Sequence, residues 1–251
     1  MNSKPNGKFP SRRFQALTAA AALVTGMCFG TAAYATPLTI VSVVGGAPTG
    51  VTHENFDNLP LGNSGGTTGS GIVVSFAPDA QAVQGTLANT YAAPFLSGGN
   101  GLGFGSPNQP NGQDATTFLT SGSTGGVAGA AVTLTLPGLE KYMGILWGSV
   151  DTYNTLTFYN GNTLVGSITG TDVDTAANGN QGATGTFYVN INSSMAFDRV
   201  VATSSQYAFE FDNVAFNPTP VAVPEPGVLG LFGLGLLLVG SGYWLQRRRL
   251  T

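Results

Sequence analysis

The chain has 251 residues, of which only 8% are charged, and its formal net charge is −3. Seven of the nine basic side chains lie in the two terminal segments, so residues 36–222 hold two basic and eleven acidic side chains, a formal charge of −9. A segment this acidic repels nucleic acid and anionic lipid, which excludes both as its partners, whereas divalent cations and neutral glycans remain compatible with it. The acidic excess also serves simple solubility in a chain so poor in charge.

The N-terminal segment has the pattern of a secretory signal peptide. Four basic side chains precede an apolar, alanine-rich stretch over residues 14–29, and a small-x-small cleavage pattern follows with Ala33 and Ala35. We predict that residues 1–35 are a signal peptide that the Sec translocon exports and that is cleaved after Ala35. An N-terminal membrane helix is the weaker alternative, because the apolar stretch is short.

The central segment, residues 36–222, reads as one all-β domain. Short β-rich runs alternate with glycine, threonine, asparagine and serine, and no stretch has a convincing helical pattern. This predicts a single β-sandwich or jelly-roll-like ectodomain. Strands are expected over residues 38–44, 72–76, 132–136, 143–147, 186–191, 199–203 and 207–216.

The clearest predicted element is a hairpin with its turn at Asn160-Gly161. Apolar and polar residues alternate from Leu156 up to this pair, and apolar residues resume at Leu164. Asn-Gly is the strongest short hairpin signal, since both residues of its turn adopt positive φ. We therefore expect Asn160 and Gly161 to be the two turn residues.

Irregular structure is expected at three places. Two glycine-rich stretches, residues 62–71 and 98–129, are predicted to be long surface loops, and such loops of a sandwich often carry binding function. The apolar residues change phase around Asp212-Asn213, which predicts a β-bulge there.

Equipment for catalysis is sparse. The single cysteine, Cys28, lies in the predicted signal peptide, and His53 is the only histidine. A Cys-His dyad and a multi-histidine zinc site are therefore excluded, and no G-x-S-x-G motif is present. Acidic residues that could supply a hydrolytic carboxylate pair are Glu54, Asp57, Asp151, Glu210 and Asp212. Because no spacing selects one pair, we expect that the protein is not an enzyme.

Calcium suits the acidic residues better than catalysis does. Calcium takes several oxygen ligands from carboxylates and main-chain carbonyls in loops. The candidate ligands of a structural calcium site are Glu54, Asp57 and Asp212, and a second acidic pair is Asp172 with Asp174. The alternative is that these residues only shape turns by hydrogen bonding to their own backbone.

Exposed aromatic side chains are the usual contacts for sugar rings. Those available are Tyr91, Trp147, Tyr153, Tyr159 and Tyr188. Trp147 stands in an apolar run and is expected in the core, whereas Tyr153 stands beside Asp151 and Asn154. Tyr153 is therefore the candidate glycan contact.

The C-terminal segment has the properties of a membrane-spanning helix. Residues 227–245 are uncharged and rich in leucine and glycine, and as a helix at ~1.5 Å per residue they approach the ~30 Å hydrocarbon thickness. The basic cluster Arg247, Arg248 and Arg249 follows. Because positive residues stay in the cytoplasm, the preceding domain is expected to face outward.

Pro224-Glu225-Pro226 stands just before this helix. The motif, the glycine-rich helix and the basic cluster together resemble the PEP-CTERM sorting signal of Gram-negative bacteria. The resemblance implies that residues 223–251 are a sorting tail, which anchors the protein transiently in the inner membrane until an exosortase, a membrane-embedded cysteine protease, cleaves near the motif. The two prolines fix φ and remove N–H donors, which suits an extended segment in a protease cleft.

The same resemblance implies a role outside the cell. We expect an exported cell-surface or extracellular protein with a structural or adhesive role in an extracellular polysaccharide matrix such as a biofilm. The second hypothesis is a non-catalytic, calcium-dependent glycan-binding module. The third is a secreted carbohydrate-active enzyme that uses a carboxylate pair.

Both processing events can be tested by mass spectrometry of the protein recovered from the cell surface or the medium. We expect a chain that begins at Thr36 and ends near Pro224-Glu225-Pro226, and any additional mass identifies a group attached there. A mass that continues through Thr251 would show a permanently anchored protein and contradict the sorting interpretation.

Overall fold

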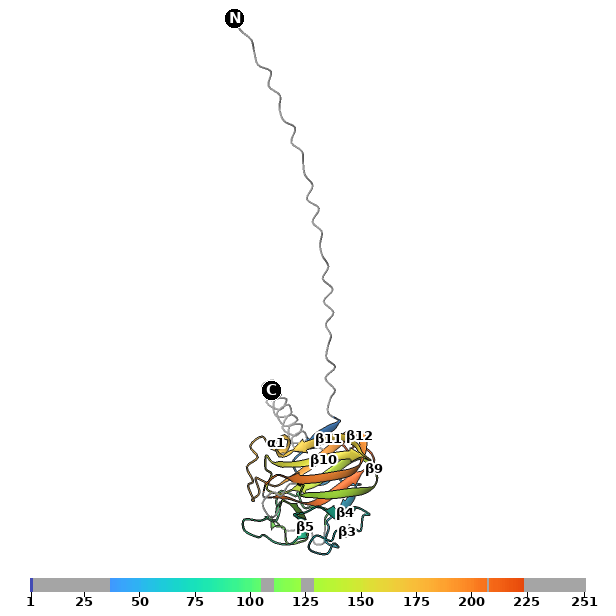
Figure 1. Cartoon of the computed structure of the whole chain (residues 1–251), viewed down its shortest axis with the longest axis vertical. Helices are drawn as coiled ribbons and strands as arrows, with labels where there is room; N and C mark the ends of the chain where they lie inside the picture. Colours follow the sequence, from blue (N-terminus) through green and yellow to red (C-terminus); the bar gives the residue numbers. More distant parts are fainter. Residues whose placement is uncertain (2–36, 105–110, 123–128, 207, 224–251) are drawn as a thin grey trace, which may run out of the picture. The chain divides into compact units, whose positions relative to one another are not determined.

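The computed structural model describes residue 1 and residues 37–104, 111–122, 129–206 and 208–223. This part of the chain is an antiparallel β structure, as the sequence predicts, with strands distant in sequence running side by side (Figure 1). The predicted signal peptide and the predicted helix 227–245 lie outside the described residues. Within the described ranges, no helix is both long and apolar enough to cross a membrane.

Thirteen strands and one helical turn, α1 (Gly170–Val173), make up the described part of the domain. The strands are β1 (Leu38–Ser42), β2 (Thr52–Glu54), β3 (Gly66–Thr67), β4 (Val73–Phe76), β5 (Ala80–Val83), β6 (Phe95–Leu96), β7 (Gly112–Gln113), β8 (Phe118–Ser121), β9 (Ala131–Trp147), β10 (Asn154–Asn160), β11 (Thr163–Thr169), β12 (Phe187–Ser204) and β13 (Phe209–Asn217). All of them except β6 and β7 belong to one sheet.

Two long strands, β9 and β12, organise this sheet. They pair antiparallel in two regions, and the register shifts between the regions. In the first region β9 is flanked by β4, and β12 is flanked by the β10–β11 hairpin. In the second region β9 is flanked by β13, and β12 is flanked by β1. Each long strand therefore contributes to both halves of the fold.

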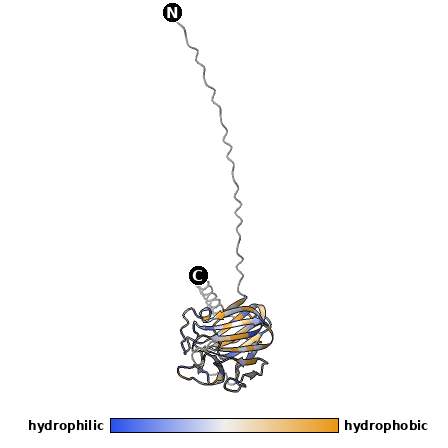
Figure 2. Cartoon of the chain, viewed as in Figure 1, coloured by the Kyte–Doolittle hydropathy of each residue, from blue (hydrophilic) through white to orange (hydrophobic). Residues whose placement is uncertain are grey.

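The register shift turns the apolar residues of both halves toward one core. Val132 and Leu134 of β9 are buried in it, and so are Ile145 and Trp147, which stand in the opposite alternation phase. Without a shift, one of these pairs would face away from the core, because side chains alternate between faces along a strand. Figure 2 shows the hydrophobic residues gathered along the strands.

The predicted strands 132–136 and 143–147 are parts of a single strand, β9, and the predicted strands 186–191 and 199–203 are parts of β12. The expected separation of residues 132–136 and 143–147 into two strands is therefore wrong. Proline is tolerated where a strand is bulged or unpaired. The residues of β9 between Thr135 and Glu140 are not paired with β12, so Pro137 removes no hydrogen bond from that pairing.

The stretches predicted as loops contain strands. Residues 62–71 contain β3, and residues 98–129 contain β7 and β8. Strand β8 pairs with both β13 and β5, and all four of its residues are buried. Its strand conformation depends on these two neighbours, because its four residues, Phe-Leu-Thr-Ser, are too few to show a clear alternation in the sequence.

The predicted hairpin is confirmed, but its turn is one residue further along the chain. Asn160 pairs with Thr163, so the two turn residues are Gly161 and Asn162. Only Gly161 of this pair has positive φ, +55°, as in a type II′ turn with glycine first. A register irregularity in the hairpin leaves Leu164 58% exposed, in contrast to the other apolar residues of the pair of strands.

The predicted bulge in β13 is confirmed. The register with β9 shifts between Asp212 and Ala215, and Asn213 has a φ of +51°. The core therefore receives Phe211 before the bulge and Val214 after it. On the other face of β13, Asp212 is fully buried.

A second apolar cluster covers the outer face of this half of the sheet, that is, the face opposite the main core. It consists of Leu96, Phe104, Tyr142, Leu146, Tyr188 and Ala215. The Tyr142 hydroxyl donates a hydrogen bond of 2.7 Å to Asn190 Oδ1 on the neighbouring strand. The outer face is thus buried beneath the segment that contains Leu96 and Phe104, and polar groups on it are shielded from water.

Replacing Gly144 by alanine is expected to destabilise the domain, because its Cβ would lie 2.5 Å from the Tyr142 hydroxyl and 2.6 Å from that of Tyr188. Both tyrosines are fully buried, so neither ring can move aside freely. We expect the free energy of unfolding, measured with urea, to fall by about 1–3 kcal/mol. Gly69→Ala is the control, since its Cβ meets no atom within 4 Å. Equal losses in the two variants would contradict this account.

Candidate functional site

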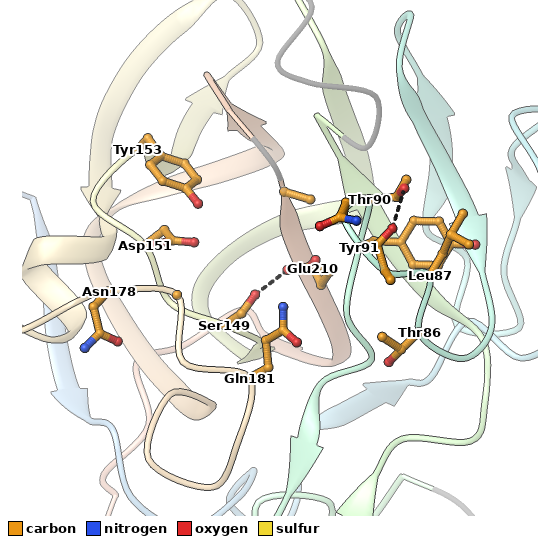
Figure 3. Close-up of a pocket in the computed structure, with 14 residues that line it drawn as sticks. Thr86, Leu87, Thr90, Tyr91, Ser149, Asp151, Tyr153, Asn178, Gln181 and Glu210 are labelled. Carbon is orange, nitrogen blue, oxygen red and sulfur yellow. Dashed lines mark hydrogen bonds between the residues drawn. The ribbon is translucent and has the colours of Figure 1, made fainter.

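A polar cleft of about 660 Å³ lies beside β13. Residues 86–91 form one wall, and residues of the 149–153 and 178–181 segments form the other. Figure 3 shows Tyr153 and Asp151 on one side, Tyr91 and Leu87 on the opposite side, and Glu210 between them. The cleft is therefore built by loops that the sandwich brings together from distant parts of the sequence.

Glu210 forms the floor of the cleft because its neighbours Phe209 and Phe211 point into the core on the other face of β13. Its carboxyl group accepts a 2.5 Å hydrogen bond from the Ser149 hydroxyl, drawn in Figure 3, and a 2.8 Å hydrogen bond from the Ala92 N–H. Burial raises the pKa of Glu210 to about 7, although these two hydrogen bonds favour the ionised form. Near neutral pH this carboxyl group is therefore partly protonated.

The wall from Ser149 to Tyr153 contains a second carboxyl group with a raised pKa. Burial raises the pKa of Asp151, and a hydrogen bond with Tyr153 partly opposes the shift. Gly179, with a φ of +70°, lies against this carboxylate, because a Cβ there would be 2.8 Å from both of its oxygens. The glycine thus allows the 178–181 segment to approach Asp151 closely.

The Tyr153 hydroxyl stays protonated at neutral pH. Burial is the main cause of its raised pKa, and the interaction with Asp151 raises it further. The side chain is only half-buried, so part of the ring remains accessible in the cleft. The predicted glycan contact therefore lines this cleft.

The opposite wall presents Tyr91 and Leu87. The ring of Tyr91 packs edge-on against Phe118 of β8, with 6.1 Å between centroids. A main-chain hydrogen bond of 3.0 Å from Leu87 N to Tyr91 O closes the loop, and Asn89 at its tip has a φ of +60°. A left-handed residue at a tight turn suits asparagine better than most residues.

The predicted calcium ligands occupy different environments. Glu54 accepts main-chain hydrogen bonds from Phe56 at 2.8 Å and Ser70 at 3.0 Å. Burial alone would raise its pKa, but the hydrogen bonds outweigh burial and lower it. Asp57 lines an open pocket of about 410 Å³ together with Glu54 and His53. The carboxylate of Glu54 is therefore already engaged in holding its own loop.

Asp212 is instead associated with Asp114, a residue that the sequence analysis did not select. Burial and the neighbouring Asp114 raise the pKa of Asp212 well above its ordinary value, and Asp57 contributes to the same shift. Within the described residues, no three His, Cys, Asp or Glu side chains are arranged to hold a metal ion by themselves. A calcium site at Glu54, Asp57 and Asp212 stays a prediction.

The second acidic pair serves local structure. Asp172 Oδ2 accepts 2.7 Å hydrogen bonds from the N–H and the hydroxyl of Thr169, at the start of α1. Asp174 Oδ1 accepts a 2.9 Å hydrogen bond from Ala176 N. Both carboxylates thus act in the turn-forming way that the alternative interpretation describes.

His53 and Trp147 are two further residues that the sequence analysis names. His53 lies on β2, packs edge-on against Phe104 at 4.9 Å, and has a pKa lowered by burial. Trp147 is fully buried and stacks on Phe209 at 4.4 Å, so its expected place in the core is confirmed.

Comparison with known families concerns the C-terminal tail. Residues 222–249 match the family model of the PEP-CTERM protein-sorting motif. The chain therefore carries a PEP-CTERM sorting motif at its C-terminal end. This motif indicates that the protein is exported and processed by an exosortase. No curated protein sequence and no solved structure gives a significant match to the chain.

The structure does not describe the sorting residues themselves. Pro224-Glu225-Pro226 and the basic cluster from Arg247 to Arg249 are inside the matched range but outside the described residues. The predicted cleavage pattern at Ala33 and Ala35 is also outside the described residues. Cleavage after Ala35 stays a prediction.

Glu210 is expected to make the stability of the domain depend on pH. Its pKa is about 7 in the folded state, against 4.5 as the ordinary value, so the folded state retains a proton that the unfolded chain releases. Stability should therefore fall as pH rises from about 4.5 through about 7, by about 3 kcal/mol from this residue. Glu210→Gln removes that contribution. The free energy of unfolding of the variant, measured with urea, should therefore rise relative to that of the wild type between pH 5 and pH 8.

Asp198→Asn is the control for this measurement, because Asp198 is a partly exposed residue that accepts a hydrogen bond from Gly161 at the β10–β11 turn. Asp198 lies outside the cleft, so this variant shows the effect of removing a carboxyl group elsewhere in the domain. A Glu210→Gln difference that stays constant from pH 5 to pH 8 would contradict the protonation of Glu210 in the cleft.

Proposed function

We propose that this exported protein binds extracellular polysaccharide in the cleft and thereby has an adhesive or structural role in the matrix around the cell. The observation that carries the proposal is the arrangement of Tyr153 and Tyr91 on opposite walls above a polar floor. Aromatic rings offer a flat apolar surface to the C–H face of a sugar, and polar groups between them can hydrogen-bond to its hydroxyls.

The polar groups of the cleft favour a neutral glycan. Asn178, Gln181 and Thr90 supply amide and hydroxyl groups that both donate and accept hydrogen bonds. Asp151 and Glu210 add acidic groups, and none of the described residues that line the cleft is basic. An anionic polysaccharide would meet repulsion without a compensating cation, whereas a neutral one would not.

The hydrogen bonding of Glu210 supports binding without catalysis. One oxygen accepts from Ser149 and the other from Ala92, and the residue is only 2% exposed. A general acid must reach the glycosidic oxygen within hydrogen-bonding distance, and this carboxyl group is turned toward the protein. Glu210 is better suited to fix the wall at Ser149 than to transfer a proton.

The second candidate function is hydrolysis of a glycoside by Asp151 and Glu210. It is favoured by the raised pKa of both carboxyl groups in one cleft, since a general acid near neutral pH needs such a shift. The two candidates differ in their products. Incubation with polysaccharide should give no new reducing ends and no unsaturated products if the cleft only binds.

Replacing Tyr153 by alanine is expected to weaken polysaccharide binding about tenfold, because one of the two aromatic surfaces is lost. The measurement is affinity electrophoresis of the processed protein through gels that contain a soluble neutral polysaccharide, dextran or galactomannan, or the anionic alginate. Tyr159→Ala is the matched control, since Tyr159 is a partly exposed tyrosine on β10 that packs against Arg199 outside the cleft. If every polysaccharide that retains the wild type retains Tyr153→Ala equally, the cleft is not the binding site.

A further inference from the structure

Asp212 is a buried carboxyl group to which no described group donates a hydrogen bond. The residue is 0% exposed, and neither of its two side-chain oxygens has a hydrogen-bond partner. The N–H of Asn213 lies close enough to Asp212 to lower the pKa of its carboxyl group, but burial and Asp114 outweigh this effect. Buried carboxylates normally have donors or a cation, because an unsatisfied charge in a protein interior is strongly unfavourable.

Two other carboxyl groups are held beside it by a short turn before β8. Asp114 accepts hydrogen bonds from the N–H and the hydroxyl of Thr116, at 2.8 Å and 2.5 Å, and its carboxyl group also interacts with Asp212. The next residue, Thr117, donates its N–H to Asp57 Oδ1 at 3.1 Å. The turn therefore brings Asp57 and Asp114 together near Asp212.

Asp114 lies close enough to raise the pKa of Asp212, and two ionised carboxyl groups cannot donate hydrogen bonds to each other. Such a pair must either share a proton or hold a cation between its oxygens. The described residues from 37 onward contain two basic side chains, Lys141 and Arg199, and Arg199 is engaged with Tyr159 and the carbonyl of Gly161. Neither is among the groups that influence Asp212.

We propose that Asp114 and Asp212 bind one calcium ion, with main-chain and water oxygens completing its coordination and with Asp57 on the solvent side attracting the cation. The ligand set consists of carboxylate oxygens, which suits calcium and not zinc. Calcium accepts irregular coordination by six to eight oxygens, whereas magnesium demands near-octahedral geometry. Asp57 lines the open pocket of about 410 Å³ and is exposed to solvent.

The export of the protein makes this ion available. Calcium sites of extracellular modules typically have dissociation constants of about 10⁻⁴–10⁻³ M, so two carboxylates and neutral oxygens are sufficient for a site of this class. The ion would join the turn before β8 to β13. This proposal is independent of polysaccharide binding, because its residues lie outside the cleft lining.

Calcium binding is tested on the processed protein without any polysaccharide. The thermal midpoint, measured by near-ultraviolet circular dichroism at pH 7.5, should rise by about 5–10 °C in calcium at one hundred times the dissociation constant, relative to EGTA. Terbium, a luminescent substitute for calcium, should show saturable emission excited through tyrosine, because Tyr188 lies near Asp212. Calcium should displace the terbium signal.

Asp212→Asn should abolish the calcium-dependent rise and the terbium signal. In EGTA the same variant should melt above wild type, because it removes the repulsion between two buried carboxyl groups. Glu210→Gln is the matched control: it alters another buried carboxyl group on the same strand and should retain the full calcium effect. If Asp212→Asn does not fold, Asp114→Asn tests the same pair.

Two results would overturn the proposal. One is an unchanged midpoint of the wild type at calcium up to about 10 mM, tenfold above the weakest sites of this class. That result would show that the pair binds no calcium. The other is an equal loss of the calcium effect in Glu210→Gln and Asp212→Asn, which would indicate nonspecific attraction of cations to an acidic domain.

Discussion

The antiparallel pairing of β9 with β12 is the constraint on which the rest of the domain depends. The two strands meet in two regions with a register shift between them, so their apolar residues enter one core from both halves of the sheet. Strands β4, β10, β13 and β1 then add to one or the other region. The position of β13, and with it the side on which Glu210 and Asp212 lie, follows from its pairing with the second half of β9.

The acidic residues of this chain are not distributed as a simple solubilising surface would require. Glu210 and Asp212 are two residues apart on β13, and both are almost completely buried on its outer face. Their surroundings nevertheless differ, because Glu210 receives two hydrogen bonds whereas Asp212 receives none. Neighbouring positions on one strand thus give a satisfied carboxyl group in a cleft and an unsatisfied one against a second aspartate.

Much of the fold could be predicted from the sequence, because alternation of apolar residues and turn chemistry are local signals. They were sufficient for the all-β class, for the hairpin after Leu156 and for the bulge at Asp212-Asn213. Local signals failed where pairing decides the structure. Strand β8 depends on β13 and β5, and the hairpin turn is displaced by one residue because Asn160 pairs with Thr163.

The candidate sites were harder to predict than the fold. Tyr153, selected as a glycan contact because it stands among polar residues, lines the cleft, and its contact with a glycan stays a prediction. Tyr91 and Asp114 were not selected, because nothing in the sequence near either residue shows which distant segment it will meet. Both residues lie in the connection between β5 and β8, and this connection brings them near residues of β13.

That long connection, residues 84–117, begins and ends at two strands that pair with each other, since Val83 is opposite Phe118. Its ends are therefore fixed close together whatever happens between them. Its described residues Leu96 and Phe104 pack over the outer face of the sheet. One wall of the cleft lies near the start of the connection and Asp114 lies near its end, so both candidate sites depend on the same closure. A substitution that disrupts the pairing of β5 with β8 would therefore disturb both sites at once.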